Sequence, residues 1–380
     1  MTRFDKRYRN GSLSLHYKLK LWSDMNTDNG PAAAPATGHY LALDGLRGVA
    51  ALLVFASHAE GIWRHVRGPF SHAHLAVDFF FVLSGFVIGH AYEQKLERGT
   101  LHLCDFAWAR WLRLYPLTFL GAMIGLISTL VHPIAAPVLI ALAGQLTFWP
   151  LFSGDLPLYF LNPVQWSVLL EILANGLHAV SLKWLSARVL AVLCLVGFAF
   201  LTFCKMRHQS FDAGFTANTF RRGCGRILCS YSAGVLLYRG VSSGRLPVIK
   251  VPFWILSLLL CGSIIGCAYA EQYRFSELLA VACFPLIVWA GVGTRLKGLE
   301  QRAARWLGRS SYPLYAVHFP LLVILTPFMP NARWMFPVVL FAGFLLALAL
   351  DPADAWARRK LVGFRQTGRL AAAPSGIWGR

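Results

Sequence analysis

The sequence predicts an all-α fold: a polytopic transmembrane helical bundle of about ten spanning helices plus one re-entrant or interfacial segment. The chain has 380 residues, of which 56% are hydrophobic and only 14% are charged, and its mean hydropathy is +0.52. A soluble domain carries about 25% charged residues. Several apolar runs also approach the ~20 residues that a helix needs to cross a bilayer. These three observations exclude an ordinary soluble globular protein.

Apolar segments follow one another along most of the chain. We expect helices at 41–59, 75–91, 116–131, 135–150, 163–182, 187–204, 226–240, 251–270, 275–293, 311–329 and 334–350. The segment 135–150 is short and has prolines near both ends, so we expect it not to span. The other ten segments then form one bundle.

Clusters of Lys and Arg set the orientation. Basic residues gather in the N-terminal segment, in the connections 93–113, 239–250 and 294–309, and in the C-terminal segment. The positive-inside rule makes these segments cytoplasmic. Both ends are then cytoplasmic, which requires an even number of spans. The basic connection 205–226 must lie outside, against the rule.

Three parts are expected along the chain. Residues 1–40 are basic and then rich in Gly, Pro and Ala, which predicts a disordered cytoplasmic tail. Residues 41–352 form the transmembrane domain, and residues 353–380 form a basic cytoplasmic tail. The N-terminal segment has no apolar stretch typical of a secretory signal, and translation starts at Met1 or at Met25.

The net charge of +19 does not indicate nucleic acid. The basic residues lie in short connections and tails, so topology and attraction to anionic headgroups explain them, and the expected partner is the lipid bilayer. Part of the charge is available for an anionic substrate. The eight cysteines lack metal-ligand spacing, which predicts no metal site. The oligomeric state is left open.

Arg47 and His58 are the most informative pair. They lie eleven residues apart, about 20° past three full turns, so they share one helix face roughly 16 Å apart. A central charge on a membrane helix costs about 2.5–3.5 kcal/mol, and such groups normally face a bundle interior or a cavity. Asp44 offers Arg47 a local ion pair. The alternatives are therefore a helix-end salt bridge and a core histidine bonded across helices.

The block FAWARWLRLYP, at 106–116, lies on the cytoplasmic side just before an expected helix. Arg110 and Arg113 are three residues apart and share a face. Because guanidinium binds phosphate bidentately, the pair predicts a phosphate clamp. The alternative is a lipid-headgroup anchor together with Trp108 and Trp111.

Three further blocks place polar groups in apolar helices. In VDFFFVLSGFVIGH, at 77–90, we interpret Ser84-Gly85 as a close-packing pair rather than a nucleophile. In NPVQWSVLLEILAN, at 162–175, Glu171 lies two turns into apolar surroundings, so it is protonated, paired or functional. In LGRSSYPLYAVHFP, at 307–320, the alternatives for His318 are a site residue and a hydrogen-bonded core histidine.

Taken together, the five blocks resemble the acyltransferase-3 family of membrane acyltransferases over about 41–320. The resemblance rests on the Arg with a His eleven residues on, FFxLSGF, RxxRxYP, WSxxxE and SYxLYxxH. It implies ten core helices and transfer of an acyl group, commonly acetyl, from cytosolic acyl-CoA to hydroxyls of extracytoplasmic glycans. The chain departs from the pattern after Glu171, where LAN replaces an aromatic pair, and at Pro313.

The expected roles follow from the blocks and the resemblance. Arg47, Arg110 and Arg113 bind acyl-CoA, which is a donor substrate, acetyl-CoA in the simplest case, rather than a resident cofactor. His58 is the general base, because its ordinary pKa is near ambient pH. Glu171 is the second catalytic residue and orients His58 or binds sugar hydroxyls. The supporting residues are Asp44, Trp166, Ser167, Tyr312, Tyr315 and His318.

The sequence thus predicts an enzyme of the bacterial inner membrane that acylates a glycan such as an exopolysaccharide or lipopolysaccharide. Direct transfer in a ternary complex is expected, with a covalent acyl-His relay as the alternative. A transporter of an anionic solute would use the same buried Arg and His residues, and a small molecule or lipid is an alternative acceptor. The absence of an inverted repeat and the RxxR block favour the enzyme.

Overall fold

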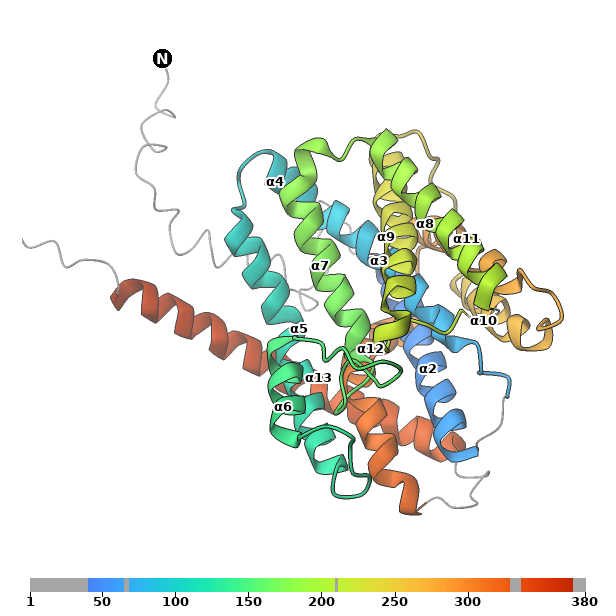
Figure 1. The fold of residues 1–380 in the computed structure, drawn as a ribbon. Helices are drawn as coiled ribbons and strands as arrows, with labels where there is room; N and C mark the ends of the chain where they lie inside the picture. Colours follow the sequence, from blue (N-terminus) through green and yellow to red (C-terminus); the bar gives the residue numbers. More distant parts are fainter. Residues whose placement is uncertain (1–39, 65–67, 209–210, 329–335, 372–380) are drawn as a thin grey trace, which may run out of the picture. The chain divides into compact units, whose positions relative to one another are not determined.

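The computed structural model describes residues 40–64, 68–208, 211–328 and 336–371, and every regular element in these ranges is helical (Figure 1). The all-α prediction is therefore confirmed for the part of the chain described. The α-helices are α2 (Leu41–Arg64), α3 (Ala76–Ile88), α4 (Gln94–Glu97), α5 (Leu103–Ser128), α6 (Val138–Thr147), α7 (Gln165–Ser181), α8 (Ala187–His208), α9 (Phe220–Ser242), α10 (Phe253–Tyr269), α11 (Ser276–Val292), α12 (Gly298–Leu325) and α13 (Phe336–Ala371). The tail expected at 1–40 lies outside the described residues except for Tyr40.

Six helical stretches in these ranges are long and apolar enough to cross a membrane. They are Leu41–Ile62, Ala73–Glu97, Leu103–Ser128, Ala187–Arg207, Gly298–Phe328 and Pro337–Val362. The helices α7, α10 and α11 have 17 residues each, at the lower limit for a span. The structure thus supports a polytopic bundle, but the expected count of about ten spans is not confirmed.

The segment 135–150 contains only the ten residues of α6 as helix. Ten residues rise about 15 Å, roughly half the ~30 Å thickness of a bilayer's hydrocarbon core. Helix α6 lies beside the end of α5 that is farthest from α4 (Figure 1). The Gln145 side chain of α6 hydrogen-bonds to that of Gln165 at the start of α7. A short helix held against its neighbours in this way supports the prediction that the segment does not span.

We expect cysteine labelling to show which side of the membrane this segment occupies. With native cysteines replaced, Ser153→Cys should react with a membrane-impermeant thiol reagent added to intact cells, and Lys297→Cys should not. Both positions are exposed. If the basic connections are cytoplasmic, the chain returns to the outer side after α5. Labelling of Ser153→Cys only after permeabilisation would reverse the expected direction of α7.

Two helices begin thirteen residues earlier than the apolar pattern indicated. Helix α5 begins at Leu103 rather than near 116, and α12 begins at Gly298 rather than near 311. Apolarity marks only the part of a helix inside the bilayer, whereas both helices continue through Arg- and Trp-containing segments. Pro116 and Pro313 lie within them, which is tolerated where neighbours satisfy the freed backbone groups. The RxxR block is thus inside a helix, and the expectation that it precedes one is wrong.

The C-terminal helix is also longer than expected. Helix α13 passes the expected domain boundary at 352 and continues to Ala371. The basic C-terminal segment thus begins within a helix. Arg309 on α12 forms an ion pair with Asp351 on α13 at 2.7 Å, which fixes α13 beside α12 near that boundary.

Close backbone contacts hold the bundle together at several interfaces, including those of α2 with α12 and of α3 with α9. A Cβ atom on Gly48 of α2 would lie 2.3 Å from the carbonyl oxygen of Leu307 on α12. A Cβ atom on Gly85 of α3 would lie 2.2 Å from the carbonyl oxygen of Tyr231 on α9. Only glycine fits at such distances, as is typical of packed membrane helices. The packing role predicted for Ser84-Gly85 is therefore confirmed for Gly85.

Helix α3 does not end cleanly but passes through a π-helical turn, η2 (Gly89–Glu93), into α4. Glu93, the last residue of this turn, is buried and accepts a hydrogen bond from His178 on α7 at 2.9 Å. Its carboxylate also forms an ion pair with Arg239 on α9 at 2.7 Å. The turn therefore joins three helices through one carboxylate.

Candidate active site

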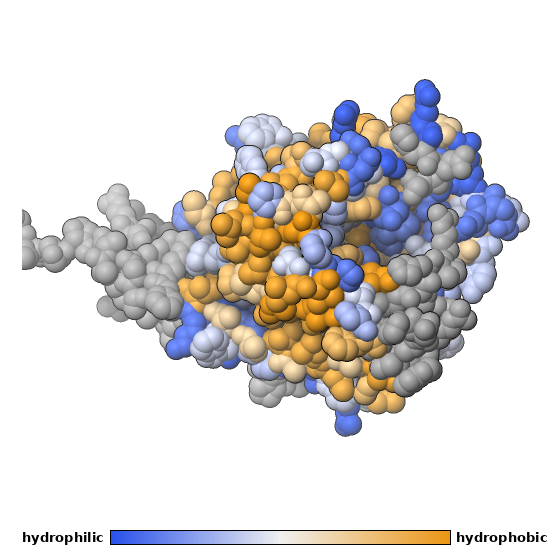
Figure 2. All heavy atoms as spheres, turned by 60° about the horizontal axis from the view of Figure 1, so that its bottom comes forward, coloured by the Kyte–Doolittle hydropathy of each residue, from blue (hydrophilic) through white to orange (hydrophobic). Residues whose placement is uncertain are grey.

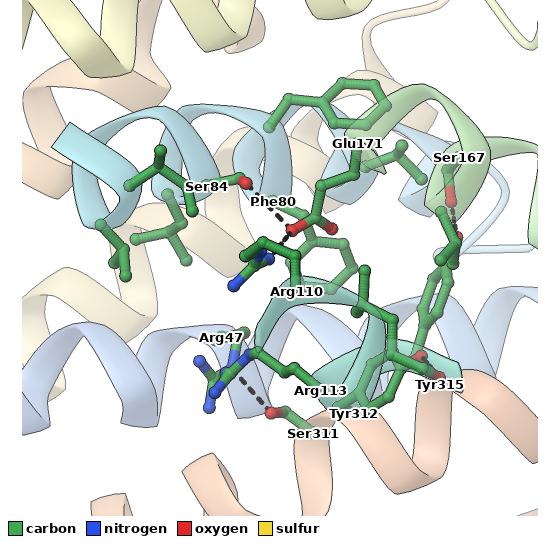
Figure 3. Close-up of a pocket in the computed structure, with 17 residues that line it drawn as sticks. Arg47, Phe80, Ser84, Arg110, Arg113, Ser167, Glu171, Ser311, Tyr312 and Tyr315 are labelled. Carbon is green, nitrogen blue, oxygen red and sulfur yellow. Dashed lines mark hydrogen bonds and ion pairs between the residues drawn. The ribbon is translucent and has the colours of Figure 1, made fainter. Parts of the chain in front are cut away.

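A cavity of about 110 Å³ lies between α2, α3, α5, α7 and α12. Three arginines reach it from one side, and a hydrogen-bonded serine and tyrosine bound it on the other (Figure 3). Apolar side chains line the wall between these groups. The polar lining residues are Arg47, Ser84, Arg110, Arg113, Ser167, Glu171, Ser311, Tyr312 and Tyr315.

Arg47 lines the cavity, but its nitrogens are engaged by the protein. Its Nη1 forms the predicted ion pair with Asp44 at 3.0 Å. Its Nε donates to Ser311 Oγ at 2.8 Å, and its Nη2 donates to the Gly308 carbonyl oxygen at 3.0 Å. Because Ser311 and Gly308 belong to α12, Arg47 fixes α2 against α12. This geometry favours the structural alternative for Arg47 over direct ligand binding.

Arg110 and Arg113 lie on one face of α5, as their spacing predicts, and both line the cavity. Arg110 Nη2 donates to Glu171 Oε1 at 2.8 Å, while its Nε is buried without a hydrogen-bond partner. Arg113 forms no hydrogen bond or ion pair with any described residue. A buried unmatched donor is costly, and the half-buried Arg113 lines the same cavity, so this cavity is suited to an anion.

Glu171 is paired, which was one of the three states expected for it. Its Oε1 accepts hydrogen bonds from Ser84 Oγ at 3.0 Å and from Arg110 (Figure 3). The structure does not bring Glu171 to His58, because Glu171 faces α3 and α5 whereas His58 faces α12. The role expected for Glu171 in orienting His58 has no support in its hydrogen bonds.

The far side of the cavity is built by two tyrosines of α12. Tyr315 shares a 2.5 Å hydrogen bond with Ser167 Oγ, and Tyr312 donates to the Leu114 carbonyl oxygen at 2.6 Å. The supporting residues Ser167, Tyr312 and Tyr315 therefore meet here. Trp166, also expected to support the site, instead packs near Arg226 at 5.5 Å in a separate cluster.

His58 and His318 form a second polar group, which does not line the cavity. His58 Nδ1 lies 2.9 Å from His318 Nε2 across the interface of α2 and α12. Arg47 and His58 thus both point at α12, which confirms that they share a face of α2. The rings of Tyr315 and His318 are 5.8 Å apart, so Tyr315 lies between the cavity and the histidines.

Sequence reasoning missed two hydroxyl groups that complete the site. Ser84 reaches Glu171, and Ser311 reaches Arg47. A serine within an otherwise apolar membrane helix needs a partner, and that signal was present for Ser84. Its partner lies 87 residues away, so spacing could not identify it. Among the described residues, no cluster of three or more His, Cys, Asp or Glu is placed to hold a metal ion.

Comparison with known proteins bears on what this cavity does. Residues 40–351 match the family described as an acyltransferase domain. A protein of Listeria monocytogenes named peptidoglycan O-acetyltransferase OatA is 25% identical over 346 residues, which cover 80% of this chain and 53% of that protein. A Rhizobium radiobacter protein named protein 2 in picA locus is 38% identical over 158 residues, covering 37% of this chain and 81% of that protein.

No solved structure matches the chain. The family match, however, includes the whole of the cavity described above, from Arg47 to Tyr315. It also includes five of the six helical stretches that can cross a membrane and part of the sixth. The chain therefore belongs to the acyltransferase family, and it is an integral membrane acyltransferase.

Proposed function

We propose that the protein transfers an acyl group, acetyl in the simplest case, from cytosolic acyl-CoA to a hydroxyl of an extracytoplasmic or membrane-proximal glycan. The Listeria relative is named as an O-acetyltransferase of peptidoglycan, which supports a glycan acceptor. Because the compared relatives are bacterial, we place the protein in a bacterial inner membrane. Both termini are cytoplasmic in this proposal, as the distribution of Lys and Arg favours.

The donor end of the site carries the proposal. Its main observation is that Arg113, which has no hydrogen-bond or ion-pair partner within the described part of the chain, lines the same cavity as Arg110 with its unmatched Nε. CoA is strongly anionic, and guanidinium groups bind phosphate with charge-assisted hydrogen bonds. Beyond the arginines, the apolar wall includes Val77, Phe80 and Val168 and is suited to the pantetheine arm. The arm would run toward Tyr315.

The acceptor end lies toward the C-terminal part of α2, where His58 is placed. On the face that Figure 2 turns forward, hydrophobic residues spread across the middle, and hydrophilic residues lie around them, mainly at the upper right. In the reaction, His58 takes the hydroxyl proton and the hydroxyl oxygen attacks the thioester carbonyl carbon. The C–S bond breaks, and the CoA sulfur leaves and regains a proton.

For the thioester to reach His58, the side chain of Tyr315 must move or the arm must pass beside it. Transfer is direct in this scheme, because a ternary complex needs no covalent intermediate. A labelled acyl group that stayed bound to the denatured protein in the absence of acceptor would favour the acyl-His relay instead.

Arg113→Ala should weaken CoA binding by about 10- to 150-fold, because it removes a charge-assisted contact worth roughly 1.5–3 kcal/mol. Arg113 is the cleaner test, since Arg110→Ala would also leave Glu171 without its partner. Binding of CoA and of 3′-dephospho-CoA to purified protein measures the effect. Arg305→Ala, an exposed arginine of α12 outside the cavity, is the matched control. Equal CoA affinity in Arg113→Ala and Arg305→Ala would contradict CoA binding by Arg113 and favour the alternative that it anchors the helix to lipid headgroups.

The acceptor is tested in the cell. Mass spectrometry of surface glycans from strains with and without the gene should show loss of an O-linked acyl group, restored by the wild-type gene. Unchanged glycans together with an altered lipid or small molecule would replace the glycan by that acceptor.

A further inference from the structure

In the hydrogen bond between His58 and His318, the surroundings of the two rings determine which nitrogen donates. His318 is 1% exposed, and its ring is enclosed by Phe55 at 5.9 Å and by Tyr315 at 5.8 Å. The His58 ring also packs edge-on against Phe319 at 5.3 Å. Such apolar surroundings favour two neutral imidazoles over charged ones. Each neutral ring then has one nitrogen that donates and one that accepts.

The backbone of α12 decides which nitrogen of His318 donates. Its Nδ1 lies 2.9 Å from the carbonyl oxygen of Tyr315 and 3.1 Å from that of Leu314. Carbonyl oxygens only accept, so Nδ1 of His318 must carry the hydrogen. The Nε2 of His318 is then bare and can only accept.

The same donor–acceptor argument applies to His58. Its Nδ1 lies 2.9 Å from the bare Nε2 of His318, so this Nδ1 must carry the hydrogen. The Nε2 of His58 is therefore left without a hydrogen. Two backbone carbonyls of α12 thus favour, through His318, a bare Nε2 on His58, whose ring also hydrogen-bonds to the Val54 backbone of α2.

We propose that His318 is a positioning residue that holds His58 in the Nδ1–H tautomer, so that Nε2 of His58 takes the acceptor's proton. The assignment of the tautomer depends only on the structure, whereas its role in acyl transfer rests on the proposed function. In a histidine general base, the hydrogen bond at one ring nitrogen sets the availability of the other. In this proposal a second histidine, His318, has the role of orienting His58 that was expected for Glu171.

His318 continues to serve after proton transfer. Once Nε2 of His58 has accepted the hydroxyl proton, both of its nitrogens donate, and Nδ1–H still points to Nε2 of His318. The bond then becomes charge-assisted and stronger. When the proton passes on to the departing CoA sulfur, His58 returns to its starting tautomer. No change of ring orientation is needed during the cycle.

Solid-state NMR of the full chain in lipid bilayers, with ¹³C,¹⁵N-labelled histidine, tests the tautomer without any activity. The His58 and His318 signals among the twelve histidines are identified by their loss in His58→Ala and His318→Ala. We expect both rings to carry hydrogen on Nδ1. A His58 ring that carries hydrogen on Nε2 in the wild-type protein would overturn the proposal, whatever the reaction is.

Two substitutions of His318 separate positioning from packing. His318→Gln keeps an acceptor near the place of Nε2, whereas His318→Phe keeps the ring volume and removes the acceptor. We expect His58 to stay in the Nδ1–H form in the Gln variant and to lose that preference in the Phe variant. If both variants kept the Nδ1–H form, the proposal would be wrong.

Kinetics then test the use of the tautomer. His318→Phe should lower kcat by at least about tenfold while the KM for acyl-CoA changes less than twofold, and His318→Gln should recover most of the loss. Wild-type kcat in His318→Phe, beside an inactive His58→Ala, would overturn the positioning role and leave the proposed function standing. Failure of the wild-type protein to use acyl-CoA would count against the proposed function alone, because the NMR result does not depend on it.

Discussion

His58→Ala should lower the rate of acyl transfer by about 10²- to 10⁴-fold, the usual contribution of a general base. His58 lies beyond Tyr315 on the side away from the arginines, and it is Nδ1, not Nε2, that lies within hydrogen-bond distance of His318. The substitution removes one hydrogen bond to His318, a net cost of about 1 kcal/mol, so the bundle should stay folded. Acyl transfer in membranes at matched protein amounts measures the effect.

The control for His58→Ala is His132→Ala. His132 is an exposed histidine in the connection after α5 that shares a hydrogen bond with Thr326, so its loss tests histidine removal without touching the site. We expect His132→Ala to transfer at the wild-type rate. Near wild-type transfer by His58→Ala would remove His58 from the mechanism.

Asp78→Ala should destabilise the bundle by about 3–5 kcal/mol, because it leaves a buried arginine without its counter-charge. Arg226 is 1% exposed and Asp78 is fully buried. Arg226 donates to the Asp78 carboxylate from Nη2 at 2.7 Å and from Nε at 3.1 Å. Its Nη1 donates to the Ala213 carbonyl oxygen, and Nη2 also donates to that of His74. Removing the carboxylate alone strands the charge among apolar neighbours.

Thermal denaturation of the purified protein in bilayers measures this loss. Asp155→Ala is the matched control, since Asp155 is exposed and bonds only to an exposed Asn218 side chain among the described residues. Its midpoint should stay near that of the wild type. The double change Asp78→Leu with Arg226→Met should recover much of the stability, because it removes both charges together. Equal midpoints for Asp78→Ala and Asp155→Ala would show that the pair is not needed.

The helical spacing within single segments could be predicted from the sequence. Arg47 and His58 share a face of α2, and both reach α12 as an eleven-residue spacing requires. Arg110 and Arg113 line one cavity for the same reason. The shortness of α6 was also visible, because prolines and length limit it.

The pairing between segments could not be predicted. Asp78 and Arg226 are 148 residues apart, and Glu171 and Arg110 are 61 apart, so no local pattern joins them. The hydrogen bonds of Glu171 do not support its expected contact with His58 for the same reason: two polar groups in one bundle were expected to meet, but α3, α5 and α12 offered other partners. Helix starts were missed where charged residues continue a helix beyond the bilayer.

The π-helical turn of α3 keeps two neighbouring helices in phase. On α7, Glu171 and His178 are seven residues apart, within about 20° of two full turns. Their partners on α3, Ser84 and Glu93, are nine residues apart, which in a regular α-helix is about half a turn out of phase. The extra residue of the π turn takes up about 100° and reduces that difference to about 80°. One inserted residue therefore lets a single helix meet α7 at two levels: without the π turn, Glu93 would lie about half a turn away from the side of the helix that faces His178.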